Sequence, residues 1–168
     1  LTKLKPGGVQ IFITSAFTMD KGNPQIRQWL AERADLVAAF RLPNDAFKEN
    51  AGTDVVTDII VLRKKDGKPF AHAKDWTSLG DTVTQKGEPI RVNQYFATHP
   101  QNILGLLDND GSMFAGREGD KKEMTVHSDP NRPPQVILQQ AIATLPRDIF
   151  GSDSTQSQAR TGLAAIKM

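Results

Sequence analysis

One loop of the chain combines an aromatic ring with polar groups in a way that suggests ligand binding. Residues 43–54 read PNDAFKENAGTD, and Phe47 is the one large apolar side chain among them. The segments on either side of this loop are strongly apolar. A loop between buried strands has no need to offer a phenyl ring to water. Phe47 therefore either folds back as a plug beneath the loop or is displayed for a ligand.

Basic and amide side chains accompany this loop and could contact a polyanion. Asn44 could hydrogen-bond a phosphate or a base, although such residues are common in loops. The basic candidates for neutralising phosphates are Arg41, Lys48, Arg63, Lys64 and Lys65. The alternative is that this cluster at the strand ends is merely solvated. None of these basic residues would then have a ligand.

No metal site is expected from the sequence. The imidazoles His72, His99 and His127 are far apart, and none has a partner at metal-ligand spacing. The segment 108–111 resembles part of a calcium loop, but that register would place apolar Leu106 at the first ligand position. The chain contains no cysteine, which excludes thiolate sites and disulfides.

Composition and length predict a soluble globular protein, either one ordinary domain or one subdomain with extensions. The 168 residues are 38% hydrophobic and 24% charged, and the formal net charge is +2. That charge is too small to indicate nucleic-acid binding by itself. No apolar run approaches the roughly 20 residues that span a bilayer, and the lack of cysteine fits a cytoplasmic location. Because the chain begins at Leu1 rather than Met, we expect it to be a piece of a longer protein.

Three apolar segments are expected to position these residues as strands. They are residues 9–14, which are rich in β-branched and aromatic side chains, and residues 36–42 and 55–62, which are rich in Val, Ile, Leu and Phe. The first two are separated by the length of a helix, which predicts a strand–helix–strand unit. The loop between the last two is too short for a crossover helix, so these strands are predicted to be antiparallel neighbours.

The helix of this unit carries an apolar stripe. Asn23 is its expected cap, with Pro24 at the first position. Residues at three- and four-residue spacing are predicted to form its packed face: Ile26, Trp29, Leu30 and Arg33.

Beyond residue 66 the chain reads as a small α+β extension, residues 67–150. It is expected to contain an irregular excursion over 69–89, a short helix capped by Asn93, a hairpin of 112–115 with 123–127, and a helix over 135–145. Residues 151–168 are expected to be a linker followed by a short helix or tail.

The first third resembles a known family through an ordered set of motifs. The set is KLKPGG, VQIFITS and NPQIRQWLAERADLVAAFRLPNDAFKENAGTDVVTDIIVLRKK. It is similar to the C-terminal half of S-adenosylmethionine-dependent methyltransferase domains, and more narrowly of N6-adenine DNA methyltransferases. In that family a KPGG turn precedes the fifth strand, a helix follows, and an LP-x-x-x-F loop leads to a strand ending in a basic pair. Residues 86–150 also resemble the region after the methylase in large methylase–helicase fusions of phages and plasmids.

The resemblance implies a fold and an activity. Residues 1–66 would form the C-terminal part of a Rossmann-like methyltransferase sheet, in an α/β fold. The parent protein would transfer a methyl group from S-adenosylmethionine to adenine N6 in double-stranded DNA, as in restriction–modification systems. Phe47 would be the ring that stacks on the flipped adenine, and stacking would restore about 1–3 kcal/mol lost on extrusion.

The resemblance also predicts what this chain lacks. The cofactor loop and the Asn/Asp-Pro-Pro-aromatic motif would lie upstream of Leu1, in the missing N-terminal half of the domain. Within the chain, GREG at 116–119 follows no buried strand, and Arg132 interrupts the register of DPNRPP at 129–134. No catalytic or cofactor-binding residue is therefore assigned here, and the chain alone is expected to be inactive.

Two alternatives remain open from the sequence. One is a non-catalytic DNA-recognition or scaffold module that keeps the methyltransferase shape. The other is a methyltransferase acting on RNA or a small molecule, since this sheet supports many chemistries.

Overall fold

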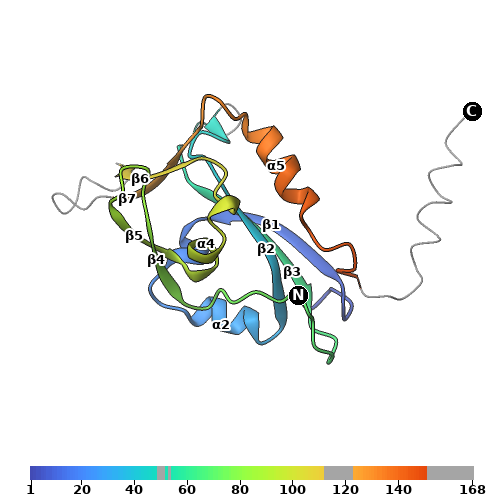
Figure 1. The fold of residues 1–168 in the computed structure, drawn as a ribbon. Helices are drawn as coiled ribbons and strands as arrows, with labels where there is room; N and C mark the ends of the chain where they lie inside the picture. The colour runs from blue at the N-terminus through green and yellow to red at the C-terminus, as the bar shows by residue number, and fades with distance from the viewer. Residues whose placement is uncertain (49–51, 53, 112–122, 151–168) are drawn as a thin grey trace, which may run out of the picture.

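A three-stranded sheet forms the centre of the molecule (Figure 1). The computed structural model describes residues 1–48, 52, 54–111 and 123–150. Strands β1 (Val9–Ser15), β3 (Thr57–Lys64) and β2 (Ala34–Leu42) lie side by side in that order. Both neighbouring pairs are antiparallel, which confirms the predicted pairing of the second and third apolar segments. Strands β1 and β2 consequently run parallel to each other on either side of β3.

Two short helices connect β1 to β2, which confirms the predicted strand–helix–strand unit. They are α1 (Phe17–Asp20) and α2 (Gln25–Ala31). The Asn23 Oδ1 accepts a hydrogen bond from the Gln25 backbone N–H at 3.0 Å. Of the predicted packed face of α2, only Leu30 packs against a buried core cluster. Ile26 is 59% exposed and Trp29 49% exposed, whereas Arg27, outside the predicted face, is only 1% exposed.

The extension consists of two hairpins, short helical turns and one longer helix. Its elements are β4 (Leu79–Val83), β5 (Pro89–Asn93), α4 (Gln94–Thr98), η1 (Pro100–Asn102), β6 (Leu106–Gly111), β7 (Glu123–His127) and α5 (Pro134–Ala143). The Asn93 cap and the last helix are confirmed. The predicted irregular excursion over 69–89 is wrong, because this segment contains strand β4. Strand β7, the second strand of the predicted hairpin, pairs with β6. Residues 112–115, the predicted partner of β7, lie outside the described residues.

Strands β2 and β3 of the central sheet are covered on both faces, whereas β1 is partly exposed. One face packs in a core cluster around Ile60, Trp76 and Phe96, and the other packs Phe40 and Val61 against α5. The described residues form a mixed α/β structure with small antiparallel sheets and few helices. Among them, no helix has the length and apolarity needed to cross a membrane.

The two outer edges of this sheet differ. On β2, the backbone N–H of Lys74 donates to the Leu36 carbonyl at 2.9 Å, and that of Leu104 donates to the Arg41 carbonyl at 2.8 Å. The extension thus closes the β2 edge. No described segment hydrogen-bonds to the outer edge of β1.

Candidate functional site

The loop that carries Phe47 begins at the carboxyl end of β2. Because β1 runs parallel to β2, its carboxyl end at Ser15 lies at the same edge of the sheet. Ligands of α/β sheets bind outside this edge. Of the sequence-predicted residues, Asn44, Phe47 and Lys48 lie here.

Phe47 is half-buried and packs against the second core cluster, beside residues of β2 and α5. This contact favours the structural plug over a freely displayed ring. Lys48 is 63% exposed along its side chain, and its Nζ lies 3.3 Å from Asp54. The Asn44 backbone N–H donates to the Val126 carbonyl of β7 at 2.8 Å, so the extension contacts this loop directly.

Replacing Phe47 with alanine measures how much the ring contributes to packing. Because the ring is half-buried, we expect the free energy of unfolding to fall by about 1–3 kcal/mol, less than the loss for a fully buried phenylalanine. Chemical denaturation of the purified chain gives this value. Phe150→Ala is the matched control, since that ring is 61% exposed and its removal should change little. Equal effects of the two substitutions would show that Phe47 is not a plug.

Arg41 does not lie where a phosphate could reach it, and its assignment to DNA is corrected. Its side chain has no exposed surface and is held by two carboxylates. Arg41 Nε and Nη2 each donate to Asp58 at 2.8 Å, and Nη1 donates to Asp20 at 2.7 Å. The guanidinium also lies 4.2 Å from the centre of the Phe96 ring.

This buried network joins the sheet to the extension. Asp20 accepts a second hydrogen bond from the Asn93 backbone N–H at 2.8 Å, and the Asn93 amide donates to the Met19 and Trp76 carbonyls. Burial alone would lower the pKa of Arg41, but the charges of Asp58 and Asp20 raise it above its usual value. The guanidinium therefore stays charged, and its role is structural.

The basic run lies at the carboxyl end of β3, which is the end of the sheet opposite to the loop that carries Phe47. Strand β3 begins opposite Leu42 and ends opposite Ala34. Its eight residues span roughly 25 Å at about 3.4 Å per residue. The expectation that the run 63–65 and Lys48 share one phosphate-binding site is therefore wrong.

Two members of that run are also engaged by the protein. Arg63 is 6% exposed, and it donates to the Ile149 carbonyl at 2.9 Å and to Asp66 at 2.6 Å. Lys64 Nζ donates to the Leu4 carbonyl at 2.7 Å. Lys65 is more exposed, 3.8 Å from Asp35.

The extension brings together an ionic cluster that the sequence did not predict. Oxygen atoms of Asp108 and Asp110 and a ring nitrogen of His127 lie within 4.8 Å of one another. Lys86 Nζ already lies 2.7 Å from Asp108, and this hydrogen bond lowers the pKa of Asp108. A protein cation thus balances the cluster, which ties the β4–β5 turn to β6 and β7.

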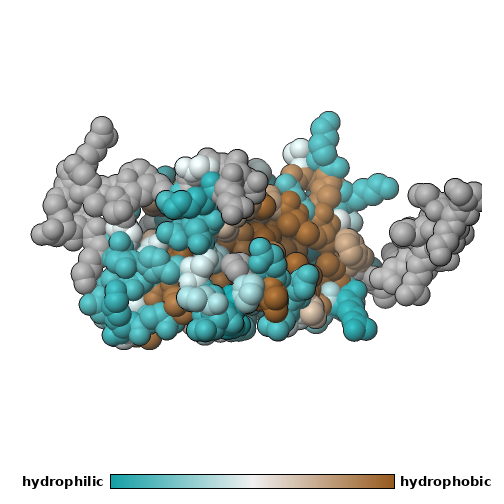
Figure 2. Space-filling model, turned by 90° about the horizontal axis from the view of Figure 1, so that it is seen from above, coloured by the Kyte–Doolittle hydropathy of each residue, from teal (hydrophilic) through white to brown (hydrophobic). Residues whose placement is uncertain are grey.

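The unpaired edge of β1 is apolar on both faces of the sheet. On one face Ile11 is 63% exposed and Ile13 55% exposed, beside the second core cluster. On the other face Phe12 borders a groove of about 250 Å³ that Ile26 and Trp29 also line. Seen from the side where α5 lies, the surface shows hydrophobic residues gathered in one area (Figure 2). The strand itself, VQIFITS, carries no charge.

Comparison of the chain with protein-family models, with curated proteins and with solved structures found no match. A functional assignment therefore depends on the residues and contacts described above.

Proposed function

We propose that residues 1–66 are the C-terminal part of a Rossmann-like methyltransferase sheet. The longer protein would transfer a methyl group from S-adenosylmethionine to adenine N6 in double-stranded DNA. One observation carries the proposal: the outer edge of β1 has no partner among the described residues, and the strand is apolar on both faces. Two parallel strands joined by a helical connection, with an antiparallel strand in the same sheet, are compatible with an α/β sheet of this kind.

The outer edge of β1 lacks the features that normally prevent an edge strand from pairing with another chain. Natural edge strands are short, carry charges or proline, or are covered by a loop. Strand β1 has seven residues and no charge, and no described segment covers it. We assign this edge to the missing N-terminal half of the methyltransferase domain, which would bring the cofactor loop and the catalytic motif.

The apolar stripe of α2 supports the same partner. Ile26 and Trp29 have the spacing of a packed helix face but are exposed beside β1. A strand added to β1, with a helix on that face, would bury both side chains. The stripe is then the packing surface of a larger domain.

The carboxyl edge of the sheet retains three candidate DNA contacts. Lys48 is exposed and could pair with a phosphate, and Asn44 lies at the start of the same loop. Phe47 keeps part of its ring exposed, and stacking on an extruded adenine would use that part. Arg41 and Arg63 are left out because carboxylates of the protein already pair with their guanidinium groups.

One observation favours the second candidate, a non-catalytic DNA-recognition or scaffold module. Val126 of β7 hydrogen-bonds Asn44, and with Leu107 it packs against Ala16 and Val56 at the carboxyl edge of the sheet. The extension thus occupies the carboxyl end of the sheet, where a ligand of an α/β sheet would bind. This arrangement suits a module that keeps the methyltransferase fold but does not catalyse the reaction.

Cofactor binding distinguishes these candidates. Calorimetric titration of this chain with S-adenosylmethionine is expected to show no micromolar binding, because the cofactor loop is absent. The longer gene product, including the residues upstream of Leu1, is expected to bind with micromolar affinity. A longer product that folds without binding the cofactor would favour the scaffold. Micromolar binding by the present chain would contradict the proposed division of the domain.

A further inference from the structure

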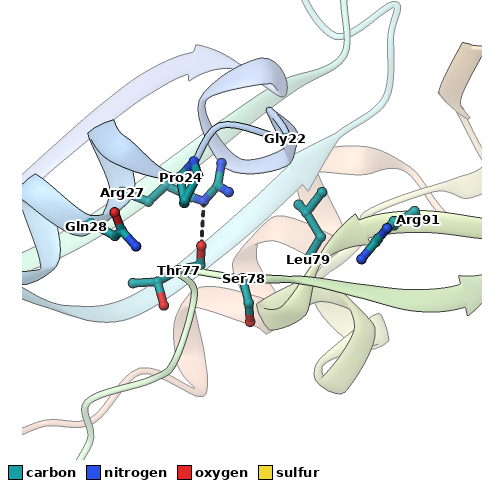
Figure 3. A pocket seen from close by; sticks show the side chains of 8 residues that line it. All are labelled: Gly22, Pro24, Arg27, Gln28, Thr77, Ser78, Leu79 and Arg91. Carbon is teal, nitrogen blue, oxygen red and sulfur yellow. Dashed lines mark hydrogen bonds between the residues drawn. The ribbon is translucent and has the colours of Figure 1, made fainter.

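A polar pocket between α2 and β4 is independent of the sites discussed above (Figure 3). It has a volume of about 360 Å³. Its lining residues are Gly22, Pro24, Arg27, Gln28, Thr77, Ser78, Leu79 and Arg91. Two of these side chains are cationic and none is acidic. Figure 3 shows Arg27 and Arg91 toward opposite ends of the pocket, with Ser78 and Leu79 between them.

Among the described residues, no carboxylate contacts the buried cation Arg27. It is 1% exposed, and its Nε donates to the Thr77 carbonyl at 3.2 Å and its Nη1 to the Lys21 carbonyl at 2.7 Å. These bonds hold α2 against the segment that enters β4. A guanidinium has five N–H donors, so donors remain for a further partner. Neutral carbonyls supply hydrogen bonds but no counter-charge, and buried charges are normally paired.

The charge of Asp20 acts on Arg27, but Asp20 is already engaged elsewhere. Burial lowers the pKa of Arg27 below its usual value, and the negative charge of Asp20 only partly opposes this shift. Its two carboxylate oxygens bond Arg41 and the Asn93 backbone N–H. Asp20 therefore cannot close on the Arg27 guanidinium without breaking the buried network.

Three other polar side chains of the pocket are also free to bind a ligand. Among the described residues, the side chains of Gln28, Ser78 and Arg91 make no hydrogen bond or ion pair. Arg91 lies directly across the ladder from Asp81, yet no ion pair joins them. A guanidinium on each side, an amide and a hydroxyl together form a set rich in hydrogen-bond donors, as phosphate oxygens require.

We infer that this pocket binds a phosphate group, held between Arg27 and Arg91. The phosphate would supply the missing counter-charge to Arg27 and accept hydrogen bonds from Ser78 and Gln28. Its source is either the DNA backbone or a free phosphate. The DNA source rests on the proposed function, whereas the pocket itself does not.

The test follows the Arg27 Nε–H resonance by NMR while inorganic phosphate is added to the full chain. Chloride at matched ionic strength is the reference. The expected result is a saturable shift with phosphate only. Arg91→Gln should weaken binding roughly tenfold, the loss of about one charge-assisted hydrogen bond. Arg132→Gln removes the same charge from an exposed site away from the pocket and should have no effect. Asp81→Asn should tighten binding by removing a nearby negative charge.

An Arg27 resonance that responds equally to chloride overturns the inference, as do equal phosphate affinities of the Arg91→Gln and Arg132→Gln variants. A short DNA duplex then identifies the source. If it displaces inorganic phosphate, and Arg91→Gln lowers the salt dependence of DNA binding by about one ion, the phosphate belongs to DNA. A duplex that leaves the pocket unaffected rules out DNA and assigns the pocket to a free phosphate. Neither result depends on methyl transfer, so a failure of the proposed function would be seen separately.

Discussion

Replacing Arg41 with alanine is expected to lower the free energy of unfolding by about 3–5 kcal/mol, because it leaves a buried carboxylate unpaired. Asp58 has no exposed side-chain surface, and both of its oxygens bond Arg41. The substitution also frees Asp20, which fixes the Asn93 backbone. Urea denaturation monitored by circular dichroism measures the change.

Arg33→Ala is the matched control for this prediction. The Arg33 side chain is 44% exposed and pairs with Glu32 on the surface, so its loss should cost at most about 1 kcal/mol. Arg41→Lys should recover only part of the stability, because an ammonium cannot form the two parallel bonds to Asp58. If Arg41→Ala costs no more than Arg33→Ala, the buried network does not stabilise the fold.

The second large effect concerns self-association through β1. An uncovered apolar edge should make the present chain associate as its concentration rises. The double variant Ile11→Lys, Ile13→Lys should raise the dissociation constant at least about a hundredfold, since each isoleucine buried in an interface contributes about 1.5–3 kcal/mol. Sedimentation equilibrium over a range of concentrations measures this constant.

The control for the edge is Val83→Lys, which places a charge on another exposed apolar residue. Val83 is 61% exposed and lies in β4, away from the central sheet. Its substitution should leave association unchanged. A wild-type chain that stays monomeric at high micromolar concentration would show that β1 needs no partner.

The order of the elements in the first third followed from local sequence patterns. The apolar strands, the helix between the first two and the antiparallel hairpin are properties of short segments, and the structure has all of them. The same antiparallel pairing implies that Lys48 and the run 63–65 lie at opposite ends of the sheet. That conclusion was available from the sequence, but proximity along the chain suggested one basic cluster.

The structural role of Arg41 could not be predicted from local sequence patterns. Its partners lie 17 and 21 residues away, so nothing near it in the sequence distinguishes a buried ion pair from a phosphate contact. Arg27 interrupts the stripe of α2, and its burial depends on a segment 50 residues further along the chain. The alternation of Ile90, Arg91 and Val92 does indicate that Arg91 points away from the core, but not which residues face it.

The most direct measurement of the proposed function is methyl transfer by the longer gene product that we propose contains this chain. The protein is incubated with S-adenosylmethionine and double-stranded DNA, and the digested nucleosides are analysed by mass spectrometry. The account predicts N6-methyladenine that appears with the longer product and is absent with residues 1–168 alone. A folded longer product that binds the cofactor but yields no N6-methyladenine on DNA of varied sequence would contradict it.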